Sequence, residues 1–143
     1  MDIAQKKASK KRKIIVIIAC LVVVALAIGG YMLNSFLTYK KNVAAIQIRN
    51  ADLSAVKDGE YFGESDTGMV GAKVKVVVKD HLITEIELIE HKNGRGEPAE
   101  VLPDKMIAEQ RIDVDAVSGA TSSSNVIRDA VYNALTGADA GGR

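Results

Sequence analysis

The sequence predicts an α+β protein in which one N-terminal transmembrane helix is followed by a small domain with an antiparallel sheet packed against helices. Three observations support this fold class. Residues 14–33 contain no charged side chain. Residues 72–88 hold two segments in which apolar and charged residues alternate, as in half-buried strands, and residues 126–135 repeat their apolar positions with the helical period. With 143 residues, the chain has room for one modest domain.

The uncharged run at residues 14–33 is long enough to cross a membrane. As a helix it spans about 30 Å, the thickness of the hydrocarbon core of a bilayer. We therefore expect a basic N-terminus over residues 1–13, a transmembrane helix over 14–37 and a juxtamembrane stalk over 38–57. Six basic residues precede the run and two follow it. The positive-inside rule then predicts a single-pass protein of the cell membrane, with a cytoplasmic N-terminus and an extracytoplasmic domain.

A cleaved signal peptide is the alternative interpretation of this run. The run is long for the apolar region of a signal peptide, and no A-x-A-like cleavage site follows it. We therefore interpret the segment as an uncleaved anchor.

Charge is distributed unevenly along the chain. The formal net charge is +1, but residues 1–41 carry eight basic residues and one acidic residue, whereas the remainder carries 11 basic and 17 acidic residues. The overall balance argues against a nucleic-acid partner, as do the aromatic content of 4% and the absence of Trp, which leave few platforms for stacking bases. The single cysteine excludes an intramolecular disulfide and a zinc site built on cysteine pairs.

We expect the domain to run from residue 58 to residue 136. It opens with a short strand at residues 61–64 and a turn at residues 65–68, Ser-Asp-Thr-Gly. A hairpin follows, whose first strand has one apolar face formed by Ala72, Val74, Val76 and Val78, and whose second strand has one formed by Leu82, Ile86 and Leu88.

A three-residue loop at residues 79–81 brings these two apolar faces together. It pairs Val78 with Leu82 and sets Lys75 opposite Glu85. Loops of this length usually end in a residue with positive φ, here His81, and histidine tolerates that conformation better than most residues. We therefore interpret His81 as a turn residue.

Two helices are predicted in the rest of the domain. After a polar loop at residues 91–99, a helix covers residues 100–110, with Pro103 in its first turn. Its apolar contacts are Val101, Leu102, Met106 and Ile107. A short strand at residues 112–117 precedes the last helix, residues 122–135, whose apolar face is formed by Val126, Ile127, Ala130, Val131, Ala134 and Leu135. Gly137 ends this helix, and residues 137–143 form a flexible tail.

Hydroxyl side chains gather at the start of the last predicted helix. They belong to Ser118, Thr121, Ser122, Ser123 and Ser124. Free backbone N–H groups and the positive end of the helix dipole make this place favourable for a phosphate. The same residue types also cap helices for purely structural reasons. No Walker lysine follows, so the segment is not a P-loop, and no nearby histidine offers a base to a serine nucleophile.

The segment Asp115-Ala116-Val117-Ser118-Gly119-Ala120-Thr121 resembles the Asp-x-x-Ser/Thr-Gly-Ala-Thr signature of FMN-binding domains that carry covalent flavin. This family includes the FMN domains of the sodium-pumping NADH:quinone reductase and of the related Rnf complex. The resemblance covers about residues 58–135, in a minimal, membrane-anchored form of the domain. It implies that a dedicated flavin transferase attaches FMN through its phosphate to Thr121. It also implies that the transferase reads Asp115, Ser118, Gly119 and Ala120.

Other residues complete the expected site. Ser122 and Ser123 can donate hydrogen bonds to the phosphate. His91 is a candidate for contact with the flavin, or else an ordinary exposed loop histidine. Gly94 and Gly96 could admit the isoalloxazine ring or could simply be turn glycines. No catalytic residue and no metal ligand is expected.

The resemblance implies a membrane-anchored, extracytoplasmic flavoprotein that carries electrons between membrane-associated donor and acceptor proteins, and is not an enzyme with its own substrate. The redox chemistry is that of FMN. Two alternatives remain open: an exported binding or structural module without flavin, in which the hydroxyl-rich segment only caps a helix, and a reductase that binds FMN noncovalently.

Overall fold

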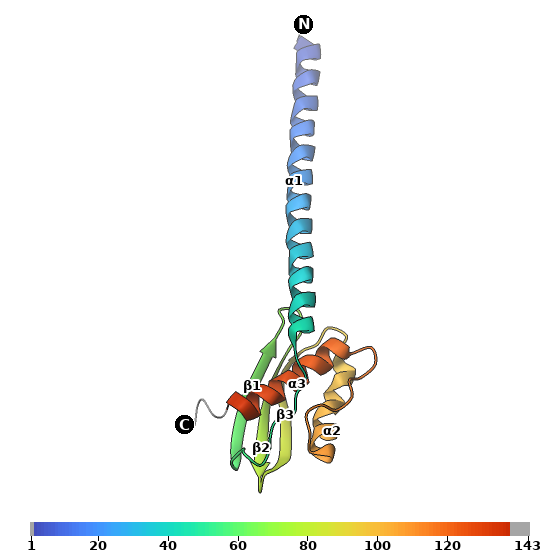
Figure 1. The fold of residues 1–143 in the computed structure, drawn as a ribbon. Helices are drawn as coiled ribbons and strands as arrows, with labels where there is room; N and C mark the ends of the chain where they lie inside the picture. Colours follow the sequence, from blue (N-terminus) through green and yellow to red (C-terminus); the bar gives the residue numbers. More distant parts are fainter. Residues whose placement is uncertain (1, 138–143) are drawn as a thin grey trace. The chain divides into compact units, whose positions relative to one another are not determined.

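The computed structural model describes residues 2–137, with side chains from residue 11 onward. The chain divides into two compact units, one up to residue 38 and one from residue 39 onward. The predicted flexible tail lies, except for Gly137, outside the described residues. The elements follow in the order α1, β1, β2, β3, a 3₁₀ turn η1, α2 and α3 (Figure 1). The α+β fold class is therefore as predicted.

Helix α1, Asp2–Ala45, contains the predicted apolar run. Its segment Lys11–Ala45 is long and apolar enough to cross a membrane, judged by length and composition. The large apolar side chains of this segment are exposed around the whole helix, as Ile14 at 55% and Leu26 at 70% illustrate. A helix that is apolar on every face needs an apolar surrounding to be stable, and a lipid bilayer provides one.

Within residues 2–137, three strands form one antiparallel sheet in the order β1-β2-β3. They are β1, Gly59–Asp66, β2, Gly71–Lys79, and β3, Leu82–Lys92. The four predicted apolar residues of β2 are at most 3% exposed and form the centre of the core. On the opposite face, Lys75 lies 2.7 Å from Glu87 and 3.6 Å from Glu85. Glu87 stands directly opposite Lys75, in place of the predicted Glu85.

The hairpin between β2 and β3 is closed by two residues, not by the three predicted. Lys79 pairs with Leu82, so the loop is Asp80-His81. Both loop residues have positive φ, 53° and 60°, as two-residue loops with a twist matched to the strands require. The positive φ of His81 is confirmed, but Leu82 is 51% exposed and does not belong to the core face.

A β-bulge brings the apolar faces of the two strands back together, although each residue of β2 beyond it pairs at least two residues further along β3 than predicted. Val78 pairs with Ile83, whereas Val77 pairs with Glu85, so Thr84 is the extra residue on β3. Ile83, 1% exposed, therefore takes the core position nearest the turn. Beyond the bulge, the predicted apolar face of the second strand is restored.

Helices α2 and α3 cover the apolar face of the sheet (Figure 1). Helix α3, Thr121–Thr136, buries all six predicted apolar residues against β1 and β2 and ends at Gly137. It approaches β1 at Gly63, where a Cβ would lie 2.8 Å from the Ala134 Cβ and would overlap the Ala130 carbonyl oxygen. Glycine is therefore required at position 63 for close packing.

The segment between β3 and α2 differs in part from the predicted loop. His91 and Lys92 belong to β3, the turn η1 covers Glu97–Val101, and α2 covers Leu102–Glu109. Pro103 lies in the first turn of α2, as predicted, because its missing N–H has no helical partner there. Val101 is 49% exposed, so its predicted contact with the core is wrong.

Residues 112–117 do not form the predicted strand. The alternation of this segment does place Ile112 and Val114 in the core, at 1% and 0% exposure. Its backbone bonds to side chains and not to a neighbouring strand. The Asn50 Oδ1 atom accepts a hydrogen bond from the Ile112 N–H at 2.8 Å, and the Arg128 guanidinium donates one to the Val114 carbonyl oxygen at 2.7 Å.

Candidate functional site

A tight turn presents the hydroxyl-rich segment. The Ala120 N–H donates a hydrogen bond to the Val117 carbonyl oxygen at 3.0 Å, which closes a four-residue turn over residues 117–120. Gly119, at the third position, has a φ of 81°. This position requires positive φ in type II turns and strongly favours glycine there. The turn delivers the chain to Thr121, the first residue of α3, whose side chain is exposed.

The N-terminus of α3 has no side-chain cap. Ala120 occupies the N-cap position, where it offers no oxygen to the first-turn N–H groups. The Ser124 hydroxyl, four residues later, accepts from the Val117 N–H at 3.0 Å and donates to the Ala120 carbonyl oxygen at 2.9 Å. The hydroxyl groups therefore do not cap α3, which is the structural role that the sequence alone left open for them. The first-turn N–H groups remain available to an anion.

A cavity of about 410 Å³ opens beside this helix end, and predicted site residues from two distant segments line it. Its wall combines the loop glycines Gly94 and Gly96 with the segment from Gly119 to Ser123. The remaining lining residues are Tyr39, Met69, Val70, Asn93 and Arg95. These five were not predicted from the sequence, because no periodicity or motif indicates that residues 39, 69, 70, 93 and 95 meet in space.

The loop over residues 93–96 is held against α3 by close packing. The Gly96 N–H donates to the Asn93 carbonyl oxygen at 2.7 Å, which closes the turn, and Gly94 within it has a φ of 55°. A Cβ on Gly96 would overlap the side chain of Ser123. Gly94 is thus favoured by its backbone conformation and Gly96 by close packing, and both also line the cavity.

His91 lies beside the loop but does not line the cavity. Its side chain is 4% exposed, and its Nδ1 atom lies 2.8 Å from Glu100 Oε1. The Asn93 side-chain amide donates to the same oxygen at 3.2 Å. These contacts lower the pKa of Glu100, the hydrogen bond to His91 being the main cause. His91 Nε2 is buried without a hydrogen-bond partner among the described residues. The structure thus places His91 as a support of the loop that carries Gly94 and Gly96.

Asp115 and Ser118 are exposed and stand outside the cavity lining. In the same region, Arg128 of α3 is 9% exposed and donates a hydrogen bond to the Val114 carbonyl oxygen. Burial lowers the pKa of Arg128, while the carboxylates of Asp113 and Asp115 oppose this shift. The site residues predicted in this segment therefore divide into two groups: Gly119 to Ser123 line the cavity, whereas Asp115 and Ser118 are exposed outside it.

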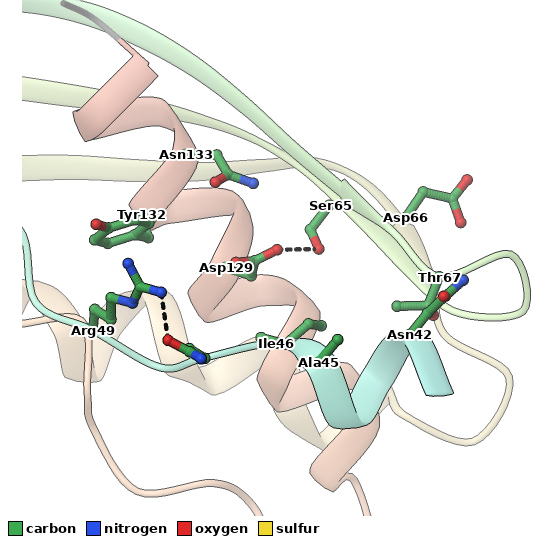
Figure 2. Close-up of a pocket in the computed structure, with 11 residues that line it drawn as sticks. Asn42, Ala45, Ile46, Arg49, Ser65, Asp66, Thr67, Asp129, Tyr132 and Asn133 are labelled. Carbon is green, nitrogen blue, oxygen red and sulfur yellow. Dashed lines mark hydrogen bonds between the residues drawn. The ribbon is translucent and has the colours of Figure 1, made fainter. Parts of the chain in front are cut away.

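A second cavity, of about 490 Å³, lies elsewhere on the domain and contains none of the motif residues. Figure 2 shows its polar wall, where the Ser65 hydroxyl donates to Asp129 Oδ2 at 2.7 Å and the Arg49 guanidinium bonds to Gln47. Acidic, basic and amide groups alternate around it, so it does not present a single charge to a ligand. It is the larger cavity, but the smaller one holds the residues of the signature.

Residues 68–136 match the family model of the FMN-binding domain. This match confirms the family to which the signature was assigned, and it begins at residue 68 and not at residue 58. A comparison with curated proteins finds no match to the chain.

Proposed function

We propose that this chain, whose residues 68–136 form a domain of the FMN-binding family, carries FMN on Thr121 through a phosphoester and serves as a membrane-anchored electron carrier outside the cytoplasm. One observation supports the attachment point above all. Thr121 is exposed at the first position of a helix whose N-terminus has no side-chain cap, and it lines a cavity large enough for part of a flavin.

The residues around Thr121 suit a phosphate in this position. The N–H groups of the first helical turn and the positive end of the helix dipole stabilise its negative charge. Ser122 and Ser123, in the same turn, add hydroxyl donors. Gly119 has no side chain, and the space where its Cβ would be is open, with no atom within 4 Å, so the approach to Thr121 is free on this side. Bound FMN would supply the redox chemistry, and the protein would supply its position and electrostatic surroundings.

The proposed partners follow from this chemistry. A flavin transferase forms the phosphoester, and membrane-associated proteins donate and accept the electrons. A covalent bond also suits an extracytoplasmic carrier, since a dissociated cofactor would diffuse away from the cell. The apolar segment Lys11–Ala45 supports the membrane anchor, and the basic residues before it support a cytoplasmic N-terminus.

The attachment is tested by replacing the acceptor. Wild type, Thr121→Ala and the control Ser122→Ala are each produced together with a flavin transferase and separated on a denaturing gel viewed under ultraviolet light. Covalent flavin survives denaturation and fluoresces. We expect fluorescence in wild type and Ser122→Ala and none in Thr121→Ala. Fluorescence retained in Thr121→Ala would move the acceptor to another residue, and a dark wild-type band with flavin in the native protein would favour noncovalent binding.

Topology is tested separately with a protease added to intact protoplasts. We expect the domain to be digested and the basic N-terminus to be protected. Protection of the domain together with cleavage of the N-terminus would reverse the proposed orientation, whatever the outcome of the flavin experiment.

A further inference from the structure

Arg95 provides the only charged side chain among the described residues that line the cavity beside Thr121. It lies between Gly94 and Gly96, at the exposed tip of the turn that packs against α3. No hydrogen bond or ion pair involves Arg95 within residues 11–137, although acidic side chains are frequent in this domain. A guanidinium in this position has free N–H donors that can bind an anion in the cavity.

The position of this guanidinium is constrained by the surrounding loop. Gly96 contacts Ser123 of α3, and Asn93 is held by Glu100, which also binds His91. Arg95 is thus attached to a backbone that is fixed on both sides, while its side chain remains exposed. The cavity therefore combines two separate sources of positive potential, the uncapped N-terminus of α3 and the Arg95 side chain.

We propose that Arg95 is the anion-binding side chain of this cavity and that it pairs with a negative charge of the flavin nucleotide. This inference rests on the proposed function. Two parts of FMN can supply the charge. One is the phosphate, and the other is the isoalloxazine ring after it has taken up two electrons and one proton. In either case the contact is a charge-assisted hydrogen bond, for which Arg is better suited than a neutral donor.

Whether the phosphate is the partner of Arg95 is tested on the full-length chain in detergent. The chain is produced without a transferase, so that no covalent flavin forms. Binding of free FMN and of riboflavin, which lacks the phosphate, is measured by fluorescence for wild type, Arg95→Gln and Arg95→Lys. Lys105→Gln, an exposed cation of α2 outside the cavity, controls for net charge. If the phosphate is the partner, Arg95→Gln weakens FMN binding about tenfold and leaves riboflavin binding unchanged, and Arg95→Lys retains part of the affinity.

Whether the reduced ring is the partner of Arg95 is tested on the covalently loaded chain by redox titration. Dithionite supplies the two electrons, and water supplies the proton. If the reduced ring is the partner, Arg95→Gln shifts the midpoint potential to more negative values, because the reduced form loses its counter-charge. Salt diminishes the difference from wild type, since the charge is exposed. Lys105→Gln keeps the wild-type potential.

The proposal is overturned if Arg95→Gln equals wild type both in its preference for FMN over riboflavin and in its midpoint potential. It is also overturned if Lys105→Gln changes either quantity as much as Arg95→Gln does. The measurement of FMN and riboflavin binding does not need covalent flavin. A wild-type chain that binds FMN through Arg95 but never becomes flavinylated would contradict the proposed attachment while supporting the role of Arg95.

Discussion

Gly96 and Ser123 are in direct contact, although they lie 27 positions apart in the sequence. A Cβ on Gly96 would overlap the Ser123 side chain and would also lie 2.9 Å from the Asn93 carbonyl oxygen. This contact joins the loop after β3 to the first turn of α3. It creates the wall of the cavity in which Arg95 and Thr121 both take part.

Replacing Gly96 with Ala should therefore separate the loop from the helix. We expect Gly96→Ala to lower the free energy of unfolding by about 1–3 kcal/mol, the range typical of overpacking, and to reduce flavin loading as the cavity changes shape. The full-length chain in detergent is unfolded with urea, and loading is measured on a denaturing gel. Gly137→Ala is the matched control, because its φ is −69° and no atom lies within 4 Å of its added Cβ. Equal stability of the two variants would contradict this packing argument.

Much of the fold is encoded in local sequence patterns, from which the buried faces of the elements can be predicted. The apolar face of β2 and the six-residue stripe of α3 follow from periods of two and 3.6 residues, and both are buried as predicted. The hairpin register could not be predicted, because the two-residue loop and the bulge at Thr84 together keep the apolar faces matched while they move the partner of Lys75 from Glu85 to Glu87. The alternation of residues 112–117 correctly indicated which side chains are buried. It did not indicate that Asn50 and Arg128 would bond to this backbone in place of a strand.

In the candidate site, too, some residues could be predicted from local sequence and others only from tertiary contacts. The signature ending at Thr121 lies in consecutive residues, so the sequence was sufficient to find it. Met69, Asn93 and Arg95 join the site only because the β2–β3 hairpin and the Gly96 contact bring distant segments together. The position of His91 before the glycines makes it a candidate for flavin contact, whereas its short contact in the structure is with Glu100. Such roles depend on tertiary contacts that no local pattern records.

The Glu100 carboxylate should make stability depend on pH in the acidic range. Its folded-state pKa lies below the ordinary value of 4.5, so its contribution is complete above that value and is lost as the pH falls through the folded-state pKa. We expect Glu100→Gln to melt below wild type at pH 7, and this difference to shrink as the pH falls below 4.5. Melting is followed by circular dichroism. Glu97→Gln, a substitution at an exposed residue of the same turn, is the control and should melt with wild type at pH 7.

Arg128 should stabilise the domain through hydrogen bonds more than through its charge. Burial already lowers the pKa of this guanidinium, so removing the charge relieves a desolvation penalty. Arg128→Met keeps most of the volume but leaves the Val114 carbonyl oxygen without its donor at 2.7 Å. We expect a loss of about 1–3 kcal/mol in the free energy of unfolding, the usual result of an unpaired buried acceptor. Urea unfolding measures it, and Lys105→Met on the surface of α2 is the control. A variant as stable as wild type would contradict this expectation, because the relieved desolvation penalty would then fully offset the lost hydrogen bond.

Replacing Asp115 tests the proposed recognition by a flavin transferase separately from folding. Its side chain is exposed, and it precedes Thr121 by six residues, so it cannot cap α3. We expect Asp115→Asn to unfold at the wild-type urea concentration, because Asn keeps the shape and hydrogen-bonding capacity of the side chain. Loading of FMN by purified transferase should nevertheless slow by about tenfold or more, the scale of one lost charged contact.

Asp113→Asn provides the matched control for this experiment. It removes the same charge two residues earlier, at an exposed position outside the signature, and it should load at the wild-type rate. If both variants load slowly, the transferase responds to the general negative charge of this segment and not to Asp115 itself. If Asp115→Asn loads as fast as wild type, Asp115 has no part in recognition, and the segment read by the transferase contracts to Ser118 through Thr121. Normal folding with slow loading in Asp115→Asn alone is the result that assigns this carboxylate to the transferase.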